Sequence, residues 1–180
     1  LEGVLHKELT AQEKRELLAR IVDLKRTYKQ LKRHPVHGHV SIFALLVKHV
    51  WLFFEAVSLG FGARNAVYGF NFTARALLFV LHHQLAIAAT HFYDDFSQVE
   101  RLAFAEDAAA TLTRFFKLMG WEYKDGPDDL KPMASSFAPL GVQIDFSFEG
   151  IALVGNTVKR VTKMKESISE LLSQLGKQAQ

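Results

Sequence analysis

Two adjacent carboxylates, Asp94 and Asp95, lie inside the aromatic segment Phe92-Tyr93-Asp94-Asp95-Phe96. Neighbouring aspartates repel each other, so a fold rarely places them in a hydrophobic hairpin unless a cation holds them. Mg²⁺ suits such a pair because it is a hard ion that prefers oxygen ligands and binds through one or two carboxylates together with substrate phosphates. The segment therefore predicts a site for Mg²⁺ or Mn²⁺.

A third carboxylate on another strand would allow two such ions to be held. Asp23 is the obvious candidate because it follows Ile21 and Val22 in the short strand predicted from Arg20 to Leu24. Two ions between Asp23 and Asp94 could activate a 3′-hydroxyl and neutralise a triphosphate and its leaving pyrophosphate. Asp95 would be a weaker or outer ligand. A helix cap or a surface turn explains most single aspartates, but we do not accept that explanation for all three together.

The composition indicates one folded domain of 180 residues, with 49% hydrophobic residues and 15 phenylalanines for its core. The net charge of +3 is compatible with nucleic acid without requiring it. The absence of cysteine excludes a disulfide framework and a thiolate zinc site. Because the chain starts at Leu1 without a signal-like apolar segment, we expect it to be a piece of something longer.

An uncharged stretch of 18 residues, Ala76 to Tyr93, tests whether the chain enters a membrane. Histidines and a glutamine interrupt the stretch, so we expect a buried helix followed by a buried strand, and no membrane partner. A small membrane-associated helical protein remains the alternative interpretation.

The periodicity of apolar residues and the turn residues predict an α+β fold built on an antiparallel sheet. Helices are expected over residues 10–19, 63–85 and 104–119 and from residue 158, with a helical turn over 26–31. Strands are expected over residues 20–24, 40–47, 50–57, 89–92, 96–99, 121–124, 140–146 and 151–154. One face of the longest helix should be buried, through Ala66, Phe70, Ala74, Leu77 and Leu81.

Four ordered segments between Ile21 and Phe146 resemble the palm of reverse transcriptases, particularly those of retrotransposons. Asp23-Leu24-Lys25-Arg26-Thr27-Tyr28-Lys29-Gln30-Leu31 resembles the first motif of that family, Leu59-Gly60-Phe61-Gly62-Ala63-Arg64-Asn65-Ala66 the second, Phe92-Tyr93-Asp94-Asp95 the third, and Leu140-Gly141-Val142-Gln143-Ile144-Asp145 a later hairpin. The chain departs from the pattern where Gly60 and Val67 replace frequent prolines.

This resemblance implies a palm-like antiparallel sheet with packed helices, with the fingers and thumb largely missing. Residues 1–20 would be a fingers remnant or linker, residues 21–155 the palm, and residues 156–180 an amphipathic helix at the start of a thumb or connection. The implied activity is RNA-directed DNA polymerisation, with the piece alone inactive. The implied partners are template–primer, deoxynucleotide and the rest of a longer polyprotein. The alternative is a degenerate palm that serves as a scaffold for nucleic acid or protein.

The resemblance also implies roles for individual residues. Asp23, Asp94 and Asp95 would be catalytic and hold two Mg²⁺ or Mn²⁺ ions. Tyr28 would lie under the sugar and exclude a 2′-hydroxyl, although without the motif an ordinary core tyrosine is an even alternative. Lys131 would lie near the leaving phosphate as a proton donor, or be a surface lysine.

The nucleotide itself would be held by backbone groups and basic side chains. Successive amides from Leu24, Lys25, Arg26 and Thr27 could bind triphosphate oxygens. In the Phe61-Gly62 pair, the glycine would let a template or nucleotide approach the backbone closely. Five cations lie within nine residues and predict either phosphate contacts or a solvated face: Lys25, Arg26, Lys29, Lys32 and Arg33.

Overall fold

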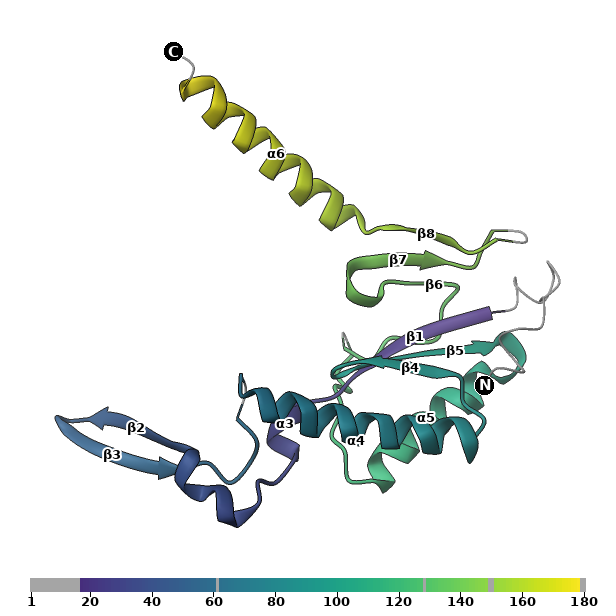
Figure 1. Ribbon diagram of the computed structural model, residues 1–180. Helices are drawn as coiled ribbons and strands as arrows, with labels where there is room; N and C mark the ends of the chain where they lie inside the picture. The colour runs from purple at the N-terminus through teal and green to yellow at the C-terminus, as the bar shows by residue number, and fades with distance from the viewer. Residues whose placement is uncertain (1–16, 61, 128, 149–150, 179–180) are drawn as a thin grey trace.

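The computed structural model describes residues 17–60, 62–127, 129–148 and 151–178 (Figure 1). Its strands are β1 (Leu17–Asp23), β2 (Ile42–Val47), β3 (Val50–Glu55), β4 (Ala89–Phe92), β5 (Asp95–Arg101), β6 (Ser136–Phe137), β7 (Val142–Asp145) and β8 (Leu153–Asn156). Its α-helices are α3 (Thr27–Gln30), α4 (Arg64–His83), α5 (Ala105–Leu118) and α6 (Val158–Gln178). Short 3₁₀ helices are η1 (Pro35–Val40), η2 (Leu102–Phe104) and η3 (Pro139–Gly141).

Three antiparallel sheets and the helices confirm the predicted α+β class. The central sheet has the order β1-β5-β4, and α4 and α5 cover one of its faces (Figure 1). The sheet β6-β7-β8 lies beyond the other face and is tied to β1 by the isolated bridge between Ala19 and Ala134. The pair β2-β3 forms a hairpin that projects away from this body.

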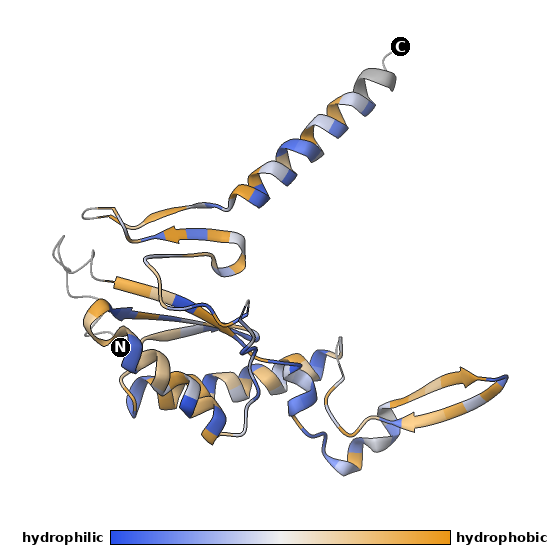
Figure 2. Cartoon of the chain, turned by 180° about the vertical axis from the view of Figure 1, so that it is seen from behind, coloured by the Kyte–Doolittle hydropathy of each residue, from blue (hydrophilic) through white to orange (hydrophobic). Residues whose placement is uncertain are grey.

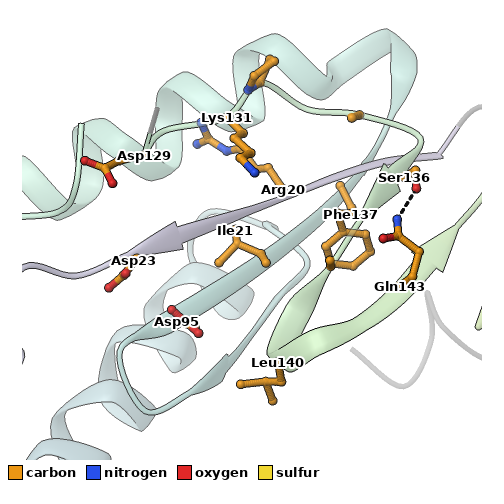
Figure 3. A pocket seen from close by; sticks show the side chains of 14 residues that line it. Arg20, Ile21, Asp23, Asp95, Asp129, Lys131, Ser136, Phe137, Leu140 and Gln143 are labelled. Carbon is orange, nitrogen blue, oxygen red and sulfur yellow. Dashed lines mark hydrogen bonds between the residues drawn. The ribbon is translucent and has the colours of Figure 1, made fainter. Parts of the chain in front are cut away.

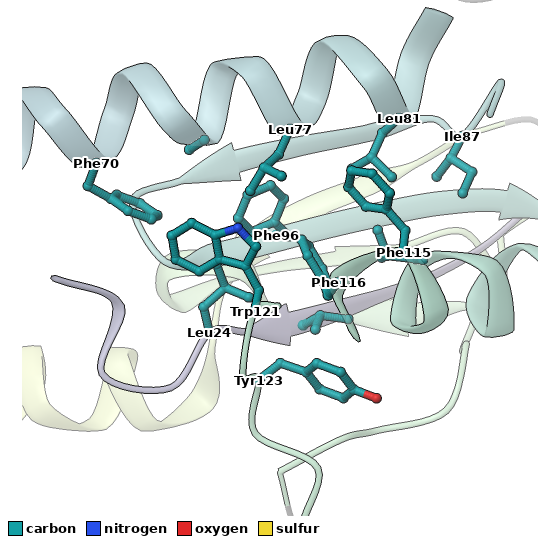
Figure 4. Packing of buried hydrophobic residues seen from close by; sticks show 13 residues of the cluster. Leu24, Phe70, Leu77, Leu81, Ile87, Phe96, Phe115, Phe116, Trp121 and Tyr123 are labelled. Carbon is teal, nitrogen blue, oxygen red and sulfur yellow. The ribbon is translucent and has the colours of Figure 1, made fainter. Parts of the chain in front are cut away.

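The hydrophobic core lies between the central sheet and the two covering helices (Figure 4). Helix α4 begins and ends close to the predicted bounds and buries the predicted face: Ala66, Phe70, Ala74, Leu77 and Leu81. Phe96 of β5 meets Phe116 of α5 edge to face, with ring centroids 5.0 Å apart. The rings of Tyr28 and Trp121 each meet Phe70 in the same way, at 5.8 and 6.0 Å. Aromatic pairs in this geometry add to the stabilisation from buried area.

The register of β1 on β5 separates core residues from polar residues at the end of the sheet. Val22 pairs with Phe96, and both are buried, while the next pair is Asp23 with Asp95. Successive side chains of a strand point to opposite faces. The two carboxylates therefore share the face opposite the helices.

Two predicted elements at the edges of this sheet differ from the structure. The helix expected over 10–19 lies mostly outside the described residues, and Leu17 to Ala19 belong to β1, because they pair in register with the end of β5. The expected strand 121–124 is wrong, since only Tyr123 forms a bridge, with Leu24, before the chain bends at Gly126. Strand β6 was not predicted, because two residues are too few to show a period.

The projecting hairpin β2-β3 confirms the predicted strand pair around Lys48 and His49. Apolar side chains are exposed on both of its faces, and Figure 2 shows its strands as mostly hydrophobic, with a hydrophilic turn at the tip. Arg33 anchors its base, because Nε donates to the Ala56 carbonyl at 2.7 Å and the guanidinium pairs with Glu55. These contacts account for Arg33, one of the five clustered cations, so its presence does not require a phosphate ligand. Among the described residues, no helix is long and apolar enough to cross a membrane.

Two phenylalanines on α4 provide a matched test of this core. Phe70 is fully buried, whereas Phe72, two residues along the same helix, is 79% exposed. We expect Phe70→Ala to lower the free energy of unfolding by about 3–5 kcal/mol, because it removes a large side chain and leaves a cavity. Phe72→Ala should change it by less than about 0.5 kcal/mol. Urea unfolding followed by circular dichroism measures both, and equal losses would contradict this packing.

Candidate active site

The predicted carboxylates lie together at one end of the central sheet, where β1 and β4 end and β5 begins. Asp23 is the last residue of β1, Asp95 is the first of β5, and Asp94 lies in the tight turn between β4 and β5. The amide of Leu24 donates to the Asp94 carbonyl at 3.0 Å, which fixes the turn beside the end of β1. Tyr93 in this turn has a φ of 51°, an uncommon left-handed conformation for an aromatic residue. Such conformations occur often at functional sites.

Burial and charge repulsion both act on the Asp95 carboxyl and raise its pKa. Burial raises the pKa of the Asp95 carboxyl first, and the negative charges of Asp23 and Asp94 raise it further, while the Lys124 ammonium opposes them. The structure thus brings Asp95 within electrostatic reach of both Asp23 and Asp94.

Lys124 is a residue of this site that the sequence analysis missed. Its ammonium forms an ion pair with Oδ2 of Asp23, and its backbone amide donates to the Asp23 carbonyl at 2.8 Å. The pKa of Lys124 is raised, chiefly by the hydrogen bond to Asp23. No motif marks this lysine, because the bridge between Tyr123 and Leu24 that delivers it joins segments far apart in the chain.

The donor chemistry of the site fits a hard divalent cation. The second oxygen of Asp23, Oδ1, is buried and has no hydrogen-bond partner within the described part of the chain. A buried carboxylate oxygen without a partner is costly, and a metal ion would satisfy it. As arranged here, however, no group of three or more His, Cys, Asp or Glu among the described residues is placed to hold a metal ion. The predicted two-ion centre therefore stays a prediction.

A cavity of about 530 Å³ opens beside the carboxylates (Figure 3). Asp23 and Asp95 line it from the sheet, Lys131 and Asp129 line it from the loop after α5, and Gln143 lines it from β7. Lys131 thus shares a cavity with two of the predicted metal ligands, and its role as a proton donor stays a prediction.

Tyr28 stands between the core and the carboxylates. It lies on α3, directly after β1, and its ring packs against Phe70. Burial raises the pKa of the Tyr28 hydroxyl, and the charges of Asp94 and Tyr93 raise it further. The Tyr28 ring is therefore a core contact, and its hydroxyl is within reach of the Asp94 charge.

Two of the four amides predicted to bind a triphosphate are already used. The Leu24 amide donates to Asp94, and the Lys25 amide donates to the Glu122 carbonyl at 2.9 Å. Only the amides of Arg26 and Thr27 remain as candidates, with Arg26 in the left-handed region at a φ of 46°. The Lys25 side chain pairs with Asp125 at 2.8 Å, and the Thr27 side chain is buried.

The second predicted motif is described only in part, since Phe61 lies outside the described residues. Gly62 has a φ of 87°, a conformation that glycine adopts readily, and a Cβ there would meet no atom within 4 Å. Gly62 is therefore explained by the turn into α4, and its contact with a nucleotide or template stays a prediction.

Comparison with known proteins identifies the fold. No family model and no curated protein sequence matches the chain. Among solved structures, the chain is similar to the foamy viral protease-reverse transcriptase in complex with dsDNA, with a TM-score of 0.68 and 14% sequence identity over 88% of this chain. The chain spans 31% of that protein, so it corresponds to less than a third of the neighbour's length.

The raised pKa of Asp95 predicts how stability depends on pH. A carboxyl whose pKa is higher in the folded state holds its proton longer there, so stability falls as pH rises from its unfolded pKa through its folded pKa. We expect Asp95→Asn to remove this fall and to raise the melting temperature at neutral pH without added metal. Asp145→Asn is the contrasting control, because Ser147 hydrogen bonds lower the pKa of Asp145 and its stabilisation is lost as pH falls. If Asp95→Asn leaves the melting curves from pH 3 to 8 unchanged, the repulsion between Asp95 and its neighbouring carboxylates is contradicted.

Proposed function

We propose that this chain is the palm of a reverse-transcriptase-like nucleotidyltransferase and adds deoxynucleotides to a primer 3′-end on an RNA template. The observation that carries the proposal is the register that sets Asp23 across from Asp95, with Asp94 in the adjoining turn. The fold similarity supports it, because the neighbouring structure is a reverse transcriptase bound to dsDNA.

Each residue of the site has its own role in the proposed reaction. When bound, two Mg²⁺ or Mn²⁺ ions would supply activation of the 3′-hydroxyl and neutralisation of the triphosphate. Asp23 and Asp94 would hold them through carboxylate oxygens, with Asp95 as the weaker or outer ligand. The Tyr28 ring would lie under the sugar and exclude a 2′-hydroxyl. Lys131 would deliver a proton to the leaving pyrophosphate. Template–primer, deoxynucleotide and the other parts of a longer polyprotein complete the proposed assembly.

A second candidate function is a degenerate palm that only binds nucleic acid or protein. The ion pair between Lys124 and Asp23 favours it, because this lysine occupies an oxygen that a catalytic metal would need. The two candidates differ in one measurable property, namely whether a divalent ion binds at the carboxylates.

Metal binding is therefore the first test. We expect Mg²⁺ or Mn²⁺ at millimolar concentration to raise the melting temperature, because a ligand that binds only the native state stabilises it. Asp23→Asn and Asp94→Asn should each abolish most of that rise. Asp125→Asn is the matched control, since Asp125 is an exposed aspartate paired with Lys25 outside the cluster. A rise that survives both cluster variants would place the ion elsewhere and favour the scaffold.

Sugar selection by Tyr28 is the second test, made in the full-length protein with a primed template. We expect Tyr28→Ala to open space for a 2′-hydroxyl and to lower the ratio of kcat/KM for deoxy- over ribonucleotides by at least about tenfold, or about 1.4 kcal/mol. Tyr28→Phe keeps the ring and should keep the ratio. A parallel loss of both activities in Tyr28→Ala would instead make Tyr28 a core residue.

A further inference from the structure

Lys124 is held beside Asp23 by the backbone as well as by its side chain. Its amide donates to the Asp23 carbonyl, and the flanking Tyr123 forms the bridge to Leu24 and is buried against Phe116. The core therefore carries the backbone of Lys124 to the carboxylates.

The ammonium of Lys124 compensates charge in the aspartate cluster through its ion pair with Asp23. Asp23 in turn lies directly across the strand pair from Asp95. A cluster of like charges that shares a low-dielectric site needs an opposite charge to stay ionised. Lys124 supplies that charge from within the chain.

The geometry also leaves room for exchange. The ammonium occupies Oδ2 of Asp23, while the buried Oδ1 has no hydrogen-bond partner within the described part of the chain. The Lys124 side chain is 44% exposed against 27% for Asp23, so the lysine lies on the open side of the pair. Asp129 lines the same cavity as Asp23, so an ammonium that leaves Asp23 has another carboxylate in that cavity.

We propose that Lys124 is a built-in counter-cation that holds the carboxylate cluster in the metal-free protein and competes with the divalent ion for Asp23. The inference rests on the proposed function, because it requires that Asp23 is a metal ligand. An ammonium and a divalent ion cannot share Oδ2 at bonding distance without strong repulsion. Lys124 therefore sets the metal affinity of this site, and metal binding displaces it.

Titration of the protein with Mn²⁺ alone, followed by calorimetry and by thermal unfolding, tests this role. We expect Lys124→Met to lower the Mn²⁺ dissociation constant roughly fivefold, because the variant removes one ion pair that competes with Mn²⁺ for Asp23. The same variant should have a lower melting temperature than the wild type without metal, because the carboxylates lose their counter-charge. Lys124→Gln carries the same test if the methionine variant does not fold.

The controls separate this inference from the proposed function. Lys159→Met removes an equal charge on α6, outside the cluster, and it should leave the Mn²⁺ affinity unchanged. Asp23→Asn added to Lys124→Met should abolish the gain. If the wild type binds Mn²⁺ through Asp23 and the Lys124 variants bind it equally or more weakly, the inference is overturned and the proposed function stands. If no protein shows Asp23-dependent binding, both are overturned.

Discussion

The in-register pairing of β1 with β5 places Asp23 across from Asp95 one step after it buries Val22 against Phe96. A shift by one residue would turn every side chain of β1 to the other face, which would expose the apolar residues and drive the carboxylate into the core. The core therefore enforces the meeting of like charges at the end of the sheet. Stability of the fold and crowding of the site are consequences of the same strand pair.

The residues around the carboxylates reach them through aromatic packing. Trp121 and Tyr28 both meet Phe70, so α4 fixes the segment after β1 and the segment after α5 at the same time. The tight end of α5 at Gly120, where φ is 77°, turns the chain back toward β1 and brings Lys124 to Asp23. A glycine is suited to that turn because it adopts the left-handed region without strain. Packing in the hydrophobic core therefore fixes the positions of the polar residues at the site.

Local patterns in the sequence were enough to predict the elements whose signal is periodic. The buried face of α4 follows from a repeat of three and four residues, and the hairpin β2-β3 follows from apolar runs on either side of Lys48 and His49. The meeting of Asp23 with the Asp94–Asp95 turn was expected from the position of Asp23 at the end of a predicted strand and from the resemblance to reverse transcriptases. Lys124 could not be predicted, because a single bridge between Leu24 and Tyr123 leaves no periodic trace. The engaged amides of Leu24 and Lys25 were missed for the same reason, since their acceptors come from distant segments.

The energetic cost of the site bears on the choice between an enzyme and a scaffold. Asp95 is held where burial and two neighbouring charges disfavour its ionised form, and Asp23 keeps a buried oxygen without a partner in the described part of the chain. Neutral residues at these positions would remove the repulsion, and a palm that only binds a partner gains nothing from keeping it. A site for divalent ions does gain, because carboxylates pressed together before the ion arrives need little rearrangement to bind it. The counter-charge of Lys124 lowers the cost of that preorganisation in the metal-free protein, and it remains exposed enough to leave. The presence of a lysine on Asp23 is thus compatible with a metal site, and the crowding of the carboxylates supports the nucleotidyltransferase proposal over the scaffold.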